Sequence, residues 1–182
     1  MAEVTLVTGG ARGGKSGYAQ RLAESQPGAR AFVATCPVLD EEMAARIARH
    51  RADRAGRGWQ TVEEPLHLAG ALDRLHDVPV VLIDCLTLWV NNLLWRAEEG
   101  GERLAEEGLT PELDRLAAAL AAHRGHVILV TNEVGWGIVP DNEVARRFRD
   151  LAGRVNQRVA ALADRVVLMV SGCPVAVKGS LP

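Results

Sequence analysis

Near its N-terminus the chain reads Gly9-Gly10-Ala11-Arg12-Gly13-Gly14-Lys15-Ser16, which fits the phosphate-loop pattern GxxxxGK[ST]. An apolar run, 4–8, precedes this segment, and a helix is expected directly after it, at 16–26. The glycines let successive backbone N–H groups point at phosphate oxygens, Lys15 supplies a compact charge to the β and γ phosphates, and the Ser16 hydroxyl is a ligand for Mg²⁺. A strand, this loop and a helix together favour nucleotide binding over a glycine-rich turn without a ligand.

The rest of the chain alternates short β-branched runs with alanine-rich amphipathic stretches. This alternation is typical of βαβ units around a parallel sheet. The expected strands are 4–8, 31–35, 78–84, 127–131 and 166–170, with shorter ones at 59–62 and 175–178. The sequence therefore predicts an α/β protein with a mostly parallel sheet flanked by helices. Its 182 residues contain no evident linker, which predicts a single domain, 1–182.

Residues that typically begin or end helices indicate where several other elements lie. Thr110 and Pro111 are expected to be the N-cap and first residue of a helix that ends near Gly125. Further helices are expected at 41–54, 66–75 and 86–95, and the polar stretch 98–108 is expected to be a surface loop. The remaining expectations concern side chains: histidines outside the 41–54 helix should be surface or capping residues (His67, His76, His123, His126), and two tryptophans should pack in the core (Trp89, Trp95).

Composition excludes several classes of protein. With 48% hydrophobic and 24% charged residues the chain has enough apolar mass for a core, and its net charge of −2 argues against a nucleic-acid binder. No apolar stretch reaches the roughly 20 residues of a membrane span, and no signal peptide is evident, so a cytoplasmic protein is expected. Cys36, Cys85 and Cys173 lack the spacing of a disulfide framework or zinc site. Only Lys15 and Lys178 are lysines among 21 basic residues.

A second part of a magnesium site is expected at the end of another buried strand, because the metal shell in such folds also uses a carboxylate there. The apolar run 80–83 ends at Asp84. Asp84 is therefore a candidate metal ligand, acting directly or through water. The alternative is that it caps the helix expected at 86–95.

His50 lies in a basic segment that admits two interpretations. On a helix it follows Met43 by seven residues and Ile47 by three, so it projects near the apolar face. Arginines surround it at positions 46, 49, 51, 54 and 57. A triphosphate would draw so many guanidinium groups together, but a solvated basic helix end, favoured by the helix dipole, explains them equally well.

Four segments together resemble one family: 7–16, 40–50, 130–140 and 147–157. They are similar to the bifunctional adenosylcobinamide kinase / adenosylcobinamide-phosphate guanylyltransferases of cobalamin biosynthesis, and the resemblance spans essentially the whole chain. It implies that ATP or GTP phosphorylates adenosylcobinamide. It also implies that GTP then donates GMP to adenosylcobinamide phosphate, releasing pyrophosphate, through a GMP-histidine intermediate on His50.

The resemblance also implies a fold, an assembly and a set of contacts. Members are similar to RecA-like P-loop proteins and form trimers. Lys15 and His50 match the catalytic positions, Ser16 and Asp84 the Mg²⁺ positions. The implied nucleotide contacts are Gly9 to Ser16, the segment Ala34, Thr35 and Cys36, the segment Arg51, Ala52, Asp53 and Arg54, and finally Glu63 and Asp84. The chain departs from many members at Gly13, where they have serine, and at the variable Trp136; neither change removes a catalytic group.

Two other functions stay open at this point. A P-loop kinase without the guanylyl step would transfer only the γ-phosphate, and a nucleotide-binding regulatory module would do no chemistry. The loop 132–142 follows a buried strand, so it is expected at the carboxyl edge of the sheet, where it lines a ligand or makes a packing contact. Trp89, Trp95 and Trp136 are candidates for an apolar surface that faces the corrinoid, although core packing is the expected role of the first two.

Overall fold

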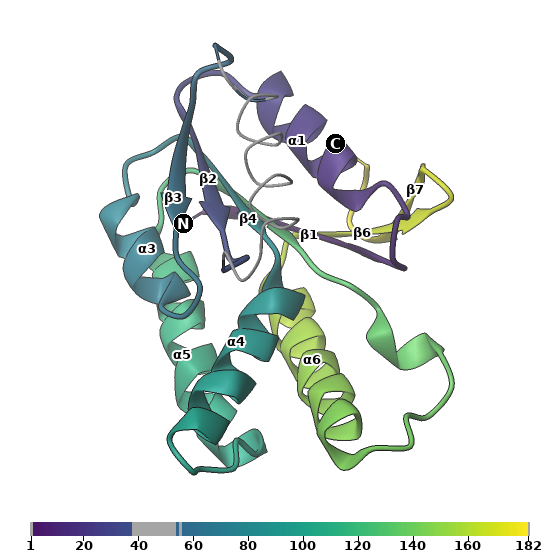
Figure 1. Ribbon diagram of the computed structural model, residues 1–182. Helices are drawn as coiled ribbons and strands as arrows, with labels where there is room; N and C mark the ends of the chain where they lie inside the picture. The colour runs from purple at the N-terminus through teal and green to yellow at the C-terminus, as the bar shows by residue number, and fades with distance from the viewer. Residues whose placement is uncertain (1, 38–53, 55, 182) are drawn as a thin grey trace.

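A computed structural model describes residues 2–37, 54 and 56–181. Its centre is a seven-stranded sheet in the order β3-β2-β4-β5-β1-β6-β7 (Figure 1). The strands are β1 (Glu3–Gly9), β2 (Arg30–Ala34), β3 (Trp59–Glu63), β4 (Val80–Asp84), β5 (His126–Val130), β6 (Arg165–Val170) and β7 (Cys173–Lys178). The first six pair in parallel and only β7 is antiparallel, which confirms the predicted α/β class.

Helices cover both faces of this sheet. Their bounds are α1 (Lys15–Ser25), α3 (Leu68–Arg74), α4 (Leu86–Glu99), α5 (Glu106–Ala122) and α6 (Glu143–Leu162), with a short 3₁₀ helix, η1, at Val134–Trp136. Figure 1 shows α1 on one side of the sheet and the other helices gathered on the opposite side. The apolar strands without alternation are explained by this double cover.

Two apolar clusters hold the layers together. Successive residues of β1 serve different clusters: Leu6 packs with residues of α3, α4, α5 and α6, whereas Val7 packs with residues of α1. All five residues of β5 are buried. Each fully buried large side chain stabilises the fold by about 1.5–3 kcal/mol relative to exposure, so the inner strands are held firmly in register.

The start of α5 differs from the prediction. The helix begins at Glu106, four residues before Thr110, and Pro111 lies inside it. Thr110 donates its hydroxyl to the backbone oxygen of Glu106 at 3.0 Å, so it is not the N-cap. The earlier start buries Leu109 completely, and proline in the second turn removes only one backbone hydrogen bond.

The loop expected at 98–108 is correspondingly shorter. Helix α4 continues to Glu99 and α5 starts at Glu106, which leaves six residues between them. The helix expected at 41–54 falls almost wholly outside the described residues. Among the described residues, none of the helices is both long enough and apolar enough to cross a lipid bilayer.

Two of the four histidines expected at the surface are buried. His123 lies with Nε2 3.0 Å from the Leu75 oxygen, and its Nδ1 accepts a hydrogen bond from the Gly125 N–H. His126 begins β5, with its Nε2 2.9 Å from the Thr5 hydroxyl. One nitrogen of each ring has a hydrogen-bonding neighbour distant in sequence, Leu75 for His123 and Thr5 for His126, whereas His126 Nδ1 has no hydrogen-bond partner among the described residues. Local polarity was therefore a misleading guide to exposure.

The structure also shows the positions of the tryptophans expected in the core and of Lys178. Trp95 is half exposed, so its predicted core position is wrong, whereas Trp89 is buried as expected and donates its indole N–H to the Leu66 oxygen. Lys178 donates to the Ala160 and Ala161 oxygens at 3.1 Å each. These carbonyls lie in the last turn of α6, where a cation complements the helix dipole.

Candidate nucleotide-binding site

The carboxyl ends of five parallel strands meet at one edge of the sheet. β1 leads into the phosphate loop, and the strand register places Ala34 of β2 beside both Glu63 of β3 and Asp84 of β4. Asp84 in turn lies beside Val130 of β5, the strand that pairs with β1. The structure therefore brings the loop and three of the other predicted nucleotide-contacting positions to the edge where ligands bind in open α/β sheets.

The phosphate loop leads into the N-terminus of α1 through residues in glycine-specific backbone conformations. Gly14 is the N-cap residue in the left-handed conformation, at φ 92°, and no side chain caps the helix. No capping side chain therefore accepts hydrogen bonds from the first backbone N–H groups of α1, so these groups can donate to phosphate oxygens. Gly9 is required for a different reason, because a Cβ there would lie 2.5 Å from the Met169 backbone oxygen.

Lys15 is the buried charge of this loop. It is only 7% exposed, and its Nζ donates to the backbone oxygen of Gly10 at 2.6 Å. Burial lowers the pKa of the Lys15 ammonium, while the negative charge of Asp84 acts in the opposite direction. A desolvated ammonium beside the helix N-terminus is an arrangement suited to neutralising transferred phosphate.

Ser16 and Asp84 fit a magnesium ion bound together with a nucleotide. Ser16 is exposed at the first turn of α1, and Asp84 is half-buried at the end of β4. Both offer hard oxygen ligands, which Mg²⁺ prefers. No group of three or more His, Cys, Asp or Glu residues suited to a metal occurs among the described residues, so phosphate oxygens and water would complete the shell.

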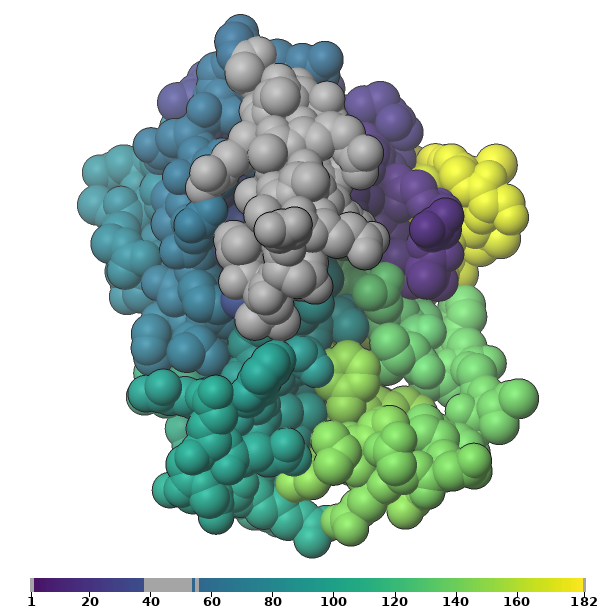
Figure 2. All heavy atoms as spheres, in the orientation of Figure 1, coloured from purple at the N-terminus to yellow at the C-terminus, as the bar shows by residue number. Residues whose placement is uncertain are grey.

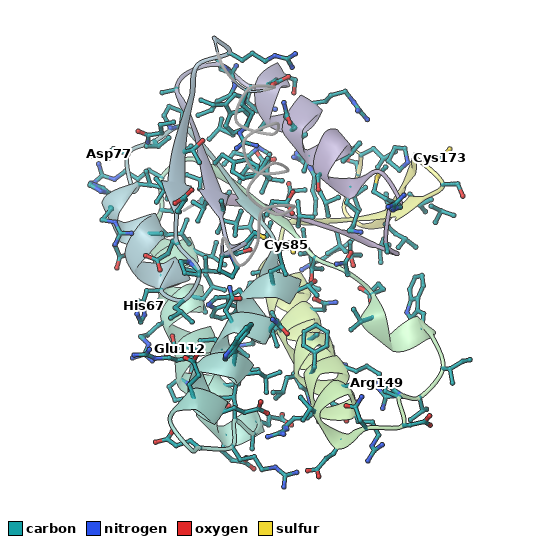
Figure 3. All side chains as sticks on the ribbon, viewed as in Figure 1. His67, Asp77, Cys85, Glu112, Arg149 and Cys173 are labelled. Carbon is teal, nitrogen blue, oxygen red and sulfur yellow. The ribbon has the colours of Figure 1, made fainter. Side chains whose placement is uncertain are left out.

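The segment after β2 is fixed against the junction of β4 and α4. The Thr35 hydroxyl donates to the Cys85 oxygen at 2.8 Å and accepts from the Cys85 N–H at 2.7 Å, and Asn92 donates to the Thr35 oxygen. Burial raises the pKa of the Cys85 thiol to about 11. Figure 3 labels Cys85 near the centre of the molecule. The neutral, buried thiol follows Asp84 directly, and these hydrogen bonds hold the segment Ala34 to Cys36 at the edge of the site.

The remaining predicted positions are placed less uniformly. Glu63 is exposed at the end of β3. The Arg54 guanidinium is 3.6 Å from the Phe32 ring centre, and the residue is buried against β2. Stacking of this kind fixes the guanidinium plane. His50 and the positions Arg51, Ala52 and Asp53 lie outside the described residues.

The turn between β6 and β7 braces the phosphate loop, a role that sequence reasoning missed. The Gly172 N–H donates to the Gly13 oxygen at 3.2 Å. The backbone of Met169, a residue of β6, lies against Gly9. Figure 3 labels Cys173 at the outer end of this hairpin, just after the bracing residue. No local motif announces the contact, because it depends on which strand lies beside β1.

A polar network, also unpredicted, lies where β5 ends. Glu133 accepts a hydrogen bond on Oε1 from the Thr8 hydroxyl at 2.6 Å and another from Asn156 Nδ2 at 3.3 Å. Asn156 accepts from the buried Thr131 hydroxyl at 2.7 Å, and the Glu133 N–H donates to the Gly9 oxygen at 3.2 Å. The run Thr131, Asn132 and Glu133 after a buried strand was a usable signal, although it did not reveal the partners.

Exposed apolar side chains follow this network. In the loop that contains η1, Trp136 is 69% exposed and Ile138 is 96% exposed. Beyond it, α4 and the start of α6 border a hollow of about 400 Å³ between the teal and green parts of Figure 2. Its lining includes Trp95 and Phe148. Apolar surface at this end of the molecule is suited to a large, flat, weakly polar ligand.

Comparisons with known proteins agree closely with one another. Residues 5–177 match the family described as cobinamide kinase / cobinamide phosphate guanyltransferase. Over 182 residues the chain is 44% identical to the bifunctional adenosylcobalamin biosynthesis protein CobU of Escherichia coli (strain K12) and 45% identical to that of Salmonella typhimurium (strain LT2), covering 95% of this chain and 98% of each relative. It is 42% identical to CobP of Pseudomonas aeruginosa over 175 residues, covering 96% of each chain.

Solved structures with a similar fold are more distant in sequence. A prototypical ATPase from the type III secretion system of pathogenic bacteria aligns with a TM-score of 0.58 at 11% identity, over 91% of this chain and 50% of that one. The RadB recombinase aligns with a TM-score of 0.54 at 17% identity, over 91% of this chain and 73% of that one. These likenesses concern the fold alone, and they agree with the expected P-loop architecture.

Proposed function

Because the chain belongs to the cobinamide kinase / cobinamide phosphate guanyltransferase family, we propose that it carries out both reactions at the carboxyl edge of its sheet. The first reaction phosphorylates adenosylcobinamide with ATP or GTP. The second transfers GMP from GTP to adenosylcobinamide phosphate and releases pyrophosphate. The main support is the buried Lys15 ammonium beside the N-terminus of α1, at the same edge as Asp84.

The nucleotide lies along this edge. Its phosphates are held by the backbone N–H groups of the loop Gly9 to Ser16 and by the Lys15 ammonium. The rim segment Ala34 to Cys36 and the carboxylate Glu63 contact the rest of the nucleotide, as do Arg51 to Arg54. Ser16 and Asp84 are the ligands for Mg²⁺, which, when bound, neutralises charge on the transferred phosphates.

The guanylyl step uses a covalent intermediate on His50. A neutral imidazole nitrogen attacks the α-phosphorus of GTP, forming a P–N bond while the bond to pyrophosphate breaks and the electron pair leaves with it. A phosphate oxygen of adenosylcobinamide phosphate then attacks the same phosphorus, and the histidine departs. Lys15 and nearby arginines stabilise the departing pyrophosphate.

Labelled GTP tests this function directly. Wild-type protein with Mg²⁺ and GTP labelled at the α-phosphate is expected to retain an acid-labile, base-stable label, and adenosylcobinamide phosphate is expected to discharge it into adenosylcobinamide-GDP. His50→Ala should retain no label. His76→Ala is the matched control, because His76 is exposed in the turn that leads into β4, at the opposite edge of the sheet, next to Asp77, which Figure 3 labels. A label that persists in His50→Ala would contradict the assignment.

The same experiment, run in parallel with nucleotide labelled at the γ-phosphate, separates the alternatives. A P-loop kinase without the guanylyl step would move label only from the γ-phosphate to cobinamide and leave none on the protein. A regulatory module would bind nucleotide without turnover. The family membership and the gathered carboxyl-edge residues favour the bifunctional enzyme over both.

Assembly and corrinoid binding complete the proposal. The domain 1–182 works as a homotrimer in the cytoplasm, where ATP and GTP are supplied, and the mass in solution from light scattering tests the trimer. The corrinoid of the substrate rests against the exposed apolar loop of Trp136 and Ile138. This loop follows β5 directly, so a ligand on it is near the phosphate loop.

A further inference from the structure

We infer that Glu133 is the general base of the kinase reaction, accepting the proton of the cobinamide hydroxyl as that oxygen attacks the γ-phosphorus. This inference rests on the proposed function, because it requires a hydroxyl acceptor in one reaction and a phosphate acceptor in the other. Three features of Glu133 carry it: its place in the sheet, the way its carboxylate is held, and the different proton demands of the two reactions.

Glu133 stands between the two proposed parts of the site, the phosphate loop and Asp84. It follows β5, which lies between β1, the strand of the phosphate loop, and β4, the strand that ends at Asp84. Its backbone N–H donates to the Gly9 oxygen at 3.2 Å, so its main chain is fixed to the first residue of the loop. A carboxylate at this position is next to the phosphates that the loop would bind.

The carboxylate is held by one oxygen only. Oε1 accepts from the Thr8 hydroxyl at 2.6 Å and from Asn156 Nδ2 at 3.3 Å, while Oε2 has no hydrogen-bond partner among the described residues. Asn156 is itself buried and fixed by the Thr131 hydroxyl at 2.7 Å. The network therefore orients Glu133 rigidly and leaves one oxygen for a further partner, the arrangement expected of a positioned base.

The proton balance assigns that partner. As the hydroxyl oxygen of cobinamide forms a bond to the γ-phosphorus, its O–H bond breaks and the proton passes to Glu133 Oε2. The bond between the γ-phosphorus and the bridging oxygen breaks, and the electron pair leaves with the nucleoside diphosphate. The protonated carboxyl returns its proton to water after product release. No other reactant is needed.

The guanylyl reaction makes no such demand. Its nucleophiles are a neutral imidazole nitrogen and then an ionised phosphate oxygen, neither of which carries a proton that must be removed before attack. Loss of the Glu133 base therefore affects one reaction and spares the other. If Glu133 only braced the phosphate loop through Thr8 and Gly9, its loss would weaken both reactions together.

The decisive variant is Glu133→Gln, which keeps the side-chain volume and an oxygen that accepts from Thr8 and Asn156. We expect kcat for phosphorylation of adenosylcobinamide to fall about 10²- to 10⁴-fold, the usual contribution of a general base. The KM for ATP and the rate of GMP transfer to supplied adenosylcobinamide phosphate should stay within about threefold of wild type. Equal loss of both reactions, or unchanged kinase turnover, would overturn the inference.

Two further variants keep the test sound. Glu112→Gln is the control, because Glu112 is a carboxylate on α5 that Figure 3 labels far from Cys85; it should leave both reactions unchanged. Thr8→Val keeps the carboxylate but removes its 2.6 Å hydrogen bond, so kinase turnover should fall partway and GMP transfer should persist. Wild-type protein without either activity would instead refute the proposed function.

Discussion

Lys15 Nζ donates a hydrogen bond to the backbone oxygen of Gly10 at 2.6 Å, so the ammonium is held inside the loop to which it belongs. The contact closes the loop on itself and places the charge at the N-terminus of α1. Arginine has a planar fork where lysine has a compact ammonium, and only a compact cation fits among the loop carbonyls.

Replacing Lys15 by methionine should abolish most of both activities. The substitution keeps an unbranched side chain of similar length but removes the charge that faces the phosphates, and one such group commonly supplies about 10²- to 10³-fold in rate. We expect losses of this size in both kinase and GMP-transfer rates, measured with saturating nucleotide. Retention of either rate within about threefold would contradict the role of Lys15 in that reaction.

Lys178→Met is the matched control, because the chain has only one other lysine. Lys178 caps the last turn of α6 and lies outside the site. Both activities should persist, while the free energy of unfolding measured in urea should fall by about 0.3–1 kcal/mol. An unchanged stability would show that the two hydrogen bonds contribute nothing net.

Gly9→Ala should destabilise the fold. A Cβ at this position meets the Met169 oxygen at 2.5 Å, and φ is 144°, a conformation that alanine avoids. We expect the free energy of unfolding to fall by about 2–4 kcal/mol. Gly10→Ala, whose Cβ meets no atom within 4 Å, should change it by less than about 0.5 kcal/mol. Similar values for the two variants would contradict the close approach of β6.

Trp136→Ala tests the apolar loop as the corrinoid contact. The side chain is mostly exposed, so its loss should leave the melting temperature unchanged. The KM for adenosylcobinamide should rise roughly tenfold, equivalent to about 1.4 kcal/mol of binding. Labelling of the protein by GTP should not change, because the nucleotide lies at the phosphate loop. A change in labelling without a change in the KM would place Trp136 at the nucleotide.

The buried His126 should make stability depend on pH. Burial lowers the pKa of this imidazole below 6.5, with the Glu3 carboxylate opposing and the Arg165 guanidinium adding to the effect; Asp164 opposes as well. Because the unfolded chain then binds more protons than the folded one, the free energy of unfolding is fully present above pH 6.5 and falls as the pH drops below that value.

His126→Gln should flatten that dependence. Glutamine does not titrate, so urea unfolding measured from pH 7.5 to about 5 should show a shallower loss of stability than in wild type. The loss that remains includes His123, whose pKa is lowered mainly by burial in the same way. Parallel curves for wild type and variant would show that His126 takes up no proton on unfolding.

Sequence alone predicts the parts of this molecule that depend on neighbouring residues in the chain. The strand, loop and helix around Lys15 were predictable because glycines, a lysine and an apolar run at fixed spacing allow few structures. The strands matched within two residues at most ends, since a fully covered strand reads as an unbroken apolar run.

Features set by distant neighbours were not predictable. Pro111 gave a false helix start because burial of Leu109 outweighs one lost hydrogen bond. His123 and His126 are polar in sequence, but each is buried with one ring nitrogen hydrogen-bonded to a partner far along the chain, the Leu75 oxygen and the Thr5 hydroxyl. The pairing of Glu133 with Thr8 and Asn156 requires knowing that β5 lies beside β1, an order that periodicity does not encode. The roles of His50 and Arg51 to Asp53 stay predictions.

The strand order has a consequence for synthesis of the protein. β1 is synthesised long before both of its neighbours in the sheet, β5 and β6, which follow it far along the chain. The nascent phosphate loop therefore lacks the complete strand pairing and the bracing turn that shape it until β6 and the turn after it have emerged. Translation products that end before β6 therefore lack both the strand pairing with β6 and the turn that shape the loop.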